Sequence, residues 1–124
     1  MKPINIGLMG VGTVGGGTAT VLKRNAEEIS RRAGREIRLF MAANRDLARA
    51  REVVGDGVPL VDDAFQVVNH PEVDIVVELI GGDTIAKELV LKAIDNGKHV
   101  VTANKAQIAV HGNEIFARAR EKGV

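Results

Sequence analysis

The chain contains 124 residues, the length of one ordinary domain, and its 17 Lys and Arg residues nearly balance 16 Asp and Glu residues. This balance gives no sign of a nucleic-acid or acidic-membrane partner. Cysteine is absent, which excludes disulfides and thiolate chemistry. Because residues 1–5 carry no signal-peptide pattern and no apolar run is long enough to span a bilayer, we expect a cytoplasmic protein without membrane contact.

The first third of the chain predicts a strand, a glycine-rich turn, a helix and a second strand. Residues Ile4–Met9 are mostly apolar and lead directly into a glycine cluster. Apolar residues over 14–33 recur at helical offsets, and Gly34 is a typical residue to follow a helix. The next strand is predicted at Ile37–Ala43.

Shorter elements are predicted in the middle of the chain. We expect a short helix at about 47–54, a small strand at 60–61 and another short helix at 63–69. The stretch 74–80 is the clearest buried strand, because it is an apolar run that ends at two glycines.

The last third continues the alternation. A helix is predicted at about 84–96 with Gly97 as its C-terminal cap, followed by a strand at 99–102 and a last helix at about 112–122. Aromatic residues make up only 2% of the chain, so the core must be aliphatic. These features predict an α/β fold whose parallel strands are covered by helices on both faces.

A glycine-rich loop joins the first predicted strand to the first predicted helix and fits the pattern G-x-G-x-x-G. This context favours a loop that binds the pyrophosphate of a dinucleotide at the positive end of the helix dipole. It also predicts a Rossmann-type, doubly wound parallel sheet in three α-β-α layers, as a single domain over residues 1–124. The alternative is a purely structural turn that packs the helix on the strand. The predicted pyrophosphate loop consists of Gly10, Val11, Gly12, Thr13, Val14 and Gly15.

Cofactor choice is predicted at the end of the second strand. An acidic residue there would bind a ribose 2′-hydroxyl, whereas an arginine favours a 2′-phosphate. Asn44 and Arg45 occupy this position, so NADP(H) is favoured over NAD(H), with dual use left open. The alternative is that Arg45 is a solvated turn residue and that Asp46 caps the following helix.

Two further loops are expected beside the nicotinamide, because ligands bind outside the carboxyl ends of parallel strands. The first consists of Ile80, Gly81 and Gly82, and the second contains Thr102 and Lys105. Spacing alone leaves two roles open for Lys105. Its ammonium would lie near a substrate carbonyl or the cofactor ribose and amide, or it would be a solvated loop lysine.

Glu78 places a charged side chain inside the clearest buried strand, where it must find a partner. We expect that partner to be a backbone N–H or a lysine, in a structural rather than a catalytic role. The histidines His70, His99 and His111 show no metal-ligand spacing, so no metal site is predicted.

Two parts of the chain resemble homoserine dehydrogenases. They are the glycine-rich segment 7–17 and the segment 76–82 followed by 97–106, of which Thr102–Lys105 is the most distinctive part. With the spacing between them, the similarity covers essentially the whole chain. The resemblance implies NAD(P)-dependent interconversion of L-aspartate 4-semialdehyde and L-homoserine, on the route to threonine, methionine and isoleucine. It also implies that Lys105 lies at the junction of cofactor and substrate, and that Arg45 contacts the 2′-phosphate.

The same resemblance implies that the chain is the N-terminal part of a longer enzyme. In the family, a substrate-binding domain with the catalytic lysine and aspartate follows residue 124. We therefore expect the chain alone to bind cofactor without turnover, and the intact enzyme to form homodimers mainly through the later domain. Two alternatives remain open: the cofactor domain of another NAD(P)-dependent dehydrogenase, and a non-catalytic module that senses dinucleotides. The segment Thr102–Lys105 favours a homoserine dehydrogenase over another dehydrogenase, whereas a reading frame that continues after Val124 would exclude the sensing module.

Overall fold

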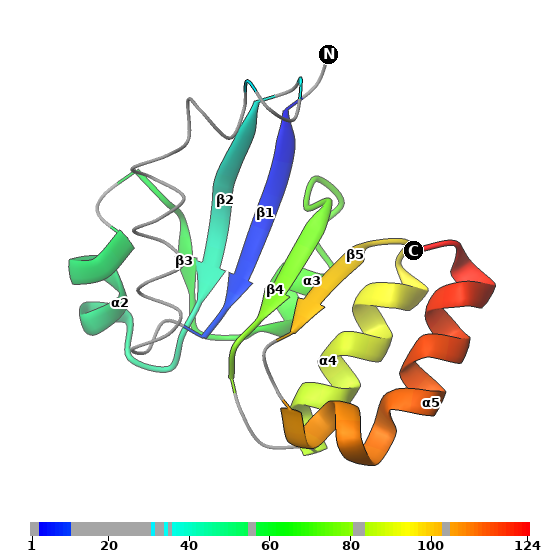
Figure 1. Ribbon diagram of the computed structural model, residues 1–124. Helices are drawn as coiled ribbons and strands as arrows, with labels where there is room; N and C mark the ends of the chain where they lie inside the picture. The colour runs from blue at the N-terminus through cyan, green and yellow to red at the C-terminus, as the bar shows by residue number, and fades with distance from the viewer. Residues whose placement is uncertain are drawn as a thin grey trace.

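The strands that the structure describes form one parallel sheet in the spatial order β3-β2-β1-β4-β5 (Figure 1). The computed structural model describes residues 3–10, 31, 34, 36–54, 57–80, 84–102 and 105–124, and only the backbone at 49, 53, 54, 84 and 105–111. The strands are β1 (Ile4–Met9), β2 (Ile37–Ala43), β3 (Leu60–Val61), β4 (Ile75–Glu78) and β5 (His99–Thr102). The helices are α2 (Leu47–Val54), α3 (Phe65–Val68), α4 (Thr84–Asp95) and α5 (Lys105–Lys122). The predicted α/β class is confirmed.

Most predicted elements have their expected bounds. The helix α4 ends at Asp95, one residue before its predicted end, and three elements differ more. The strands β1, β2, β3 and β5 and the helix α2 begin and end where the sequence predicts. The strand β4 and the helix α3 are shorter than predicted, whereas α5 begins at Lys105 rather than near residue 112. The helix predicted over 14–33 lies outside the described residues except at position 31, and Gly34 has the left-handed φ of +73° that a helix cap requires.

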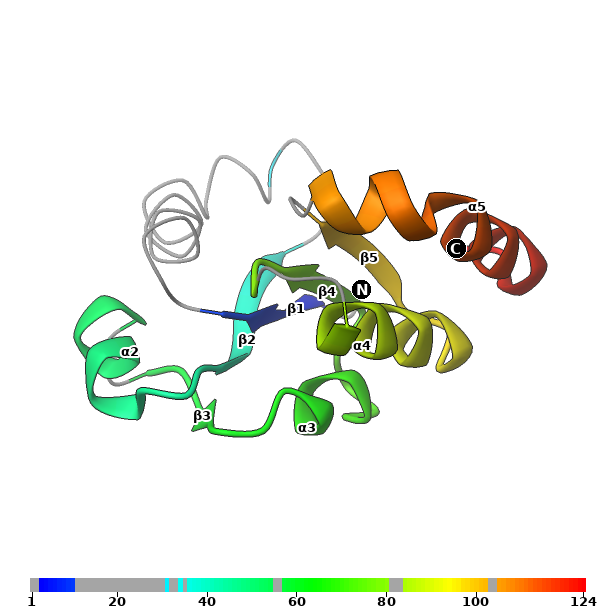
Figure 2. The same cartoon turned by 90° about the horizontal axis from the view of Figure 1, so that it is seen from below.

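The core lies on both faces of the sheet, as parallel strands require. On one face, Ile6 and Leu8 of β1 and Val77 of β4 pack with Ala50 of α2. On the other face, Met9 of β1 and Val76 of β4 pack against α3 and α4. Figure 2 shows α3 and α4 on the same side of the sheet, with α5 beside α4. The residues that α3 and α4 contribute to this second face are Val67, Val68, Leu89 and Ala93.

A second layer of packing holds α5 against α4. Val90 and Ile94 of α4 are buried together with Ile115 of α5. Two ion pairs flank this contact, Lys87–Glu114 at 2.7 Å and Arg118–Asp95 at 2.8 Å. Exposed ion pairs of this kind contribute only about 0–1 kcal/mol each, so the apolar contact holds the two helices together.

Lys98 is a buried lysine at the start of β5. Only 5% of the residue is exposed, and its ammonium donates hydrogen bonds to the carbonyl oxygens of His70 at 2.6 Å and Val73 at 2.7 Å. Burial lowers the pKa of the Lys98 ammonium below its ordinary value, and the carboxylate of Asp74 opposes part of that shift. The charged side chain therefore holds the segment before β4 to the start of β5.

We expect Lys98→Met to lower the free energy of unfolding by about 1–3 kcal/mol, because two buried carbonyl groups lose their donor. The lowered pKa of Lys98 also makes the stability of the fold depend on pH. Between the folded and unfolded pKa values of Lys98, the unfolded chain binds more protons, so this group makes stability rise with alkaline pH. Urea unfolding of both proteins at neutral and alkaline pH would check this. An equal alkaline change in the variant would contradict the assignment to Lys98.

Candidate functional site

The carboxyl ends of β1, β2 and β4 meet at one edge of the sheet. Gly10 follows β1, Asn44 and Arg45 follow β2, and Leu79 and Ile80 follow β4. Strand order reverses at β1, because β2 lies on one side of it and β4 on the other. In open parallel sheets, a reversal of this kind leaves a crevice in which ligands bind.

Gly10 brings three segments of backbone together at this edge. Its N–H donates to the carbonyl oxygen of Ala43 at 2.9 Å, and its φ is +95°. A Cβ at this position would lie 3.1 Å from both the carbonyl carbon and the oxygen of Leu79. These are main-chain atoms that cannot rotate away, so both the conformation and the space at this position require glycine.

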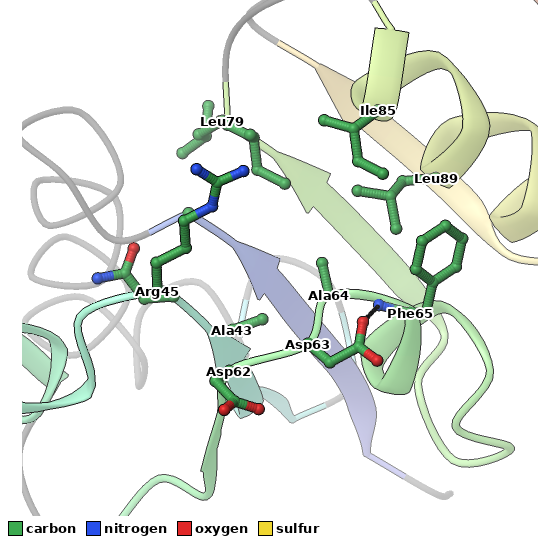
Figure 3. A pocket seen from close by; sticks show the side chains of 12 residues that line it. Ala43, Arg45, Asp62, Asp63, Ala64, Phe65, Leu79, Ile85 and Leu89 are labelled. Carbon is green, nitrogen blue, oxygen red and sulfur yellow. Dashed lines mark hydrogen bonds between the residues drawn. The ribbon is translucent and has the colours of Figure 1, made fainter.

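A cavity of about 630 Å³ lies beside Gly10, within the usual range for a site that holds a small molecule (Figure 3). One side of it is apolar, with Leu79 and Ile80 from the end of β4, Ile85 and Leu89 from α4, and Phe65 at the start of α3. The other side is polar and comes from the ends of β2 and β3. The lining residues are Gly10, Ala43, Asn44, Arg45, Asp62, Asp63, Ala64, Phe65, Leu79, Ile80, Ile85 and Leu89.

Arg45 is the cation in the described lining of this cavity. Its side chain is exposed, and Figure 3 shows its guanidinium extending from the end of β2 toward Leu79. The neighbouring turn is fixed by the side-chain amide of Asn44, which donates to the carbonyl oxygen of Asp46 at 2.9 Å. The turn therefore holds the base of Arg45 in place while its charged end remains exposed at the cavity.

The polar floor of the cavity is also built by local hydrogen bonds. The carboxylate of Asp63 accepts from the backbone N–H of Phe65 at 2.9 Å, which fixes the turn into α3 (Figure 3). Asp62, one residue earlier, follows β3 and lines the cavity with an exposed side chain. These residues were missed as site residues by sequence reasoning. An aspartate directly after a strand was the available clue, but the short β3 gave little reason to place it at the site.

Glu78 lies at the end of β4 with no exposed surface. Its Oε2 accepts a hydrogen bond from the Thr102 hydroxyl at 2.5 Å, across the β4–β5 pair. Its Oε1 is buried and has no hydrogen-bond partner among the residues that the structure describes. The sequence predicts a backbone N–H or a lysine as the partner of Glu78. Among the described contacts its partner is instead the hydroxyl group of Thr102, so this prediction is wrong there.

The predicted site residues fall into three groups. Gly10, Asn44, Arg45 and Ile80 line one cavity, whereas Thr102 lies beside Glu78 outside that lining. Lys105 is the first residue of α5 rather than a loop residue, and only its backbone is described. The residues Val11, Gly12, Thr13, Val14, Gly15, Gly81 and Gly82 lie outside the described part of the chain.

The described residues contain neither a cluster of metal ligands nor a helix that could span a membrane. Within them, no group of three or more histidine, aspartate or glutamate side chains is arranged to hold a metal ion. His70 instead packs edge-on against Phe40, with 5.1 Å between the ring centroids. Among the described helices, none has the length and apolar character needed to cross a membrane.

A parallel sheet in this order, with a glycine-dependent crevice where the strand order reverses, defines a dinucleotide-binding domain of the Rossmann class. A protein-family profile described as the NAD-binding domain of homoserine dehydrogenase matches residues 10–124. The chain belongs to this family, the NAD-binding domain of homoserine dehydrogenase.

Similar proteins agree with this membership. A homoserine dehydrogenase from Pseudomonas aeruginosa is 64% identical over the whole chain, which covers 28% of that protein. One from Methylobacillus glycogenes is 62% identical over 98% of the chain and 30% of that protein. The crystal structure of a homoserine dehydrogenase from Thiobacillus denitrificans superposes on the whole chain with a TM-score of 0.94 and 65% identity, over 28% of that structure. The chain thus spans less than a third of each of these three relatives.

Proposed function

We propose that this chain binds NADP(H) as the cofactor domain of an enzyme that interconverts L-aspartate 4-semialdehyde and L-homoserine. The cofactor proposal rests on the cavity at the point where the strand order reverses, with Gly10 at one side and the exposed guanidinium of Arg45 at another. Membership in the homoserine dehydrogenase family supports the reaction and the two substrates. A cytoplasmic location and a homodimer formed outside this chain belong to the same proposal.

The cavity fits the adenosine end of the cofactor. Its apolar wall, with Phe65, Ile85 and Leu89, suits a flat base, which gains free energy when its faces leave water. Arg45 would hold the 2′-phosphate, because a guanidinium binds phosphate oxygens through paired, charge-assisted hydrogen bonds. Asp62 lies in the same lining and would repel that phosphate, so the preference for NADP(H) depends on Arg45.

The other parts of the cofactor are assigned to the neighbouring strand ends. The loop from Gly10 to Gly15 would hold the pyrophosphate, and Gly81 and Gly82 after β4 would leave room for the nicotinamide half. When bound, the cofactor would supply the hydride that reduces the aldehyde carbon, or accept it in the reverse direction, while the oxygen on that carbon gains or loses a proton. Thr102 would contact this end of the cofactor, and Lys105 would hold its ammonium at the junction of cofactor and substrate, where it stabilises charge on the reacting oxygen.

We expect Arg45→Ala to raise the Kd for NADPH about tenfold to a hundredfold and to leave the Kd for NADH nearly unchanged. This is the effect of losing about 1.5–3 kcal/mol of charge-assisted hydrogen bonding to a group that only NADPH carries. Calorimetric titrations of the intact protein with both cofactors, at one salt concentration, would measure it. Arg120→Ala is the matched control, since Arg120 is an exposed arginine in the last turn of α5.

The possible outcomes separate the parts of the proposal. Equal weakening of NADPH and NADH would mean that Arg45 supports the cavity without selecting the phosphate. Tighter binding of NADH than of NADPH to the unsubstituted protein would overturn the NADP(H) preference and keep the cofactor site. Binding of neither dinucleotide would overturn the proposed function.

A further inference from the structure

Glu78 is a fully buried carboxylate that the proposed cofactor contacts leave without a role. It is the last residue of β4, and no part of it is exposed. Strand alternation places its side chain on the same face of the sheet as Val76, which packs with Leu89 of α4. The carboxylate therefore lies at the carboxyl edge of the sheet, enclosed on the side covered by α4.

None of the described ion pairs involves this side chain, and the described cation at this edge, Arg45, is exposed in the cavity lining beside Leu79. The Thr102 hydroxyl donates to Oε2, while Oε1 is buried without a described partner. Lys98 donates to carbonyl groups at the opposite end of β5, and Lys87 pairs with Glu114 on the helices. Enclosure keeps water from screening the carboxylate, so its field extends further than that of a surface acid.

A neutral side chain would satisfy Thr102 equally well. The side-chain oxygen of a glutamine accepts a hydrogen bond from a hydroxyl as a carboxylate does, and it avoids the free-energy cost of burying a charge. The hydrogen bond alone therefore does not explain why the residue at position 78 is charged. A role for the charge itself does explain it, and in the proposed function the group that changes charge at this end of the cofactor is the nicotinamide ring.

We propose that the buried carboxylate of Glu78, held against Thr102 at the ends of β4 and β5, selects the oxidised over the reduced cofactor. This inference rests on the proposed function, which assigns Thr102 to the nicotinamide end. The oxidised ring carries one positive charge and the reduced ring carries none, so a nearby buried anion stabilises only the oxidised form. Glu78 acts through its charge and does not need to contact the ring.

The test compares Glu78→Gln with the unsubstituted intact protein. Calorimetric titrations with NADP⁺ and NADPH give the ratio of the two Kd values, and we expect the substitution to raise Kd(NADP⁺)/Kd(NADPH) about tenfold. A tenfold change corresponds to about 1.4 kcal/mol, which is the order of magnitude expected for a charge–charge interaction at an effective dielectric constant of about 20. Glu88→Gln removes an exposed carboxylate from α4 and is expected to leave the ratio unchanged.

Two further variants and the salt dependence test whether the charge of Glu78 is responsible. Glu78→Asp retains the charge and is expected to keep the original ratio, whether or not Glu78→Gln folds. Glu78→Met removes the charge with a side chain of similar length and is expected to raise the ratio as Gln does. The change should also persist at high salt, because the charge is enclosed. Circular dichroism of each variant would establish that it is folded.

The outcomes distinguish failure of this inference from failure of the proposed function on which it rests. Loss of affinity for both cofactors by the same factor would show that Glu78 is only structural and would overturn the inference. An unchanged ratio in a folded Gln or Met variant would overturn it as well, as would a raised ratio in Glu78→Asp. Failure of the unsubstituted protein to bind either cofactor would instead overturn the proposed function.

Discussion

Replacing Gly7 with valine is expected to lower the free energy of unfolding by about 4 kcal/mol or more. Gly7 lies in the middle of β1, the central strand of the described sheet. A Cβ at this position would lie 2.4 Å from Cγ1 of Val67 and 3.0 Å from Cγ1 of Val73. Both valines are buried, with 0% and 2% exposure, so neither has free space to move into. The expected loss exceeds the roughly 1–3 kcal/mol of ordinary overpacking, because two extra methyl groups follow the Cβ.

Urea denaturation of the intact protein would measure this loss, with Gly57→Ala as the control. A Cβ at Gly57 meets no atom within 4 Å, so we expect a change within about 0.5 kcal/mol there. Combining Gly7→Ala with Val67→Ala removes the atom that the new Cβ would strike, so the two changes should together cost less than their sum. Additive losses would show that contact with Val67 is not the cause.

The sequence predicts those elements whose pattern is local. The apolar runs of β1, β2 and β5 each end at a residue that changes the pattern, so their bounds could be read directly. The end of β4 is a weaker boundary. Leu79 lies beyond the assigned strand, yet its N–H still donates to the carbonyl oxygen of Met9 at 2.9 Å, so backbone pairing continues for one residue past the assigned end of β4.

The start of α5 could not be read from local pattern in the same way. Gly112 disfavours a helix interior by about 1 kcal/mol relative to alanine, and a helix beginning there was the simpler prediction. In the structure Gly112 is buried inside α5, which runs from Lys105 through Lys122 and packs on α4. Tertiary packing therefore outweighs the local preference at this glycine.

The same contrast applies to the candidate site: residues set by local sequence could be predicted, and residues brought together by tertiary packing could not. Arg45 could be predicted because the residues that follow the second strand have a fixed relation to a bound ribose in this fold class. Phe65, Ile85 and Leu89 were missed because a cavity wall depends on how α3 and α4 are placed against the sheet. The partner of Glu78 was also missed, since Thr102 is adjacent to it only through the pairing of β4 with β5.

Replacing Lys105 with alanine is expected to change activity and stability in opposite directions. In the intact protein we expect kcat/KM for homoserine oxidation to fall at least a hundredfold, as when one donor to a charged transition state is lost. Stability should stay the same or rise by about 0.3–1 kcal/mol. Lys105 is the first residue of α5, and a cation at the positive end of a helix dipole is unfavourable.

Steady-state kinetics and urea denaturation of the same variant would test the pair of effects, with Lys122→Ala as the control. Lys122 is a lysine in the last turn of the same helix, where a cation is favourable, so its loss should reduce stability slightly and leave activity unchanged. If Lys105→Ala kept full kcat/KM, the assignment of Lys105 to the reaction would be wrong. If it lost stability and activity together, Lys105 would be holding the β5–α5 junction. Gain of stability with loss of turnover would instead identify a residue kept for function at an unfavourable place in the fold.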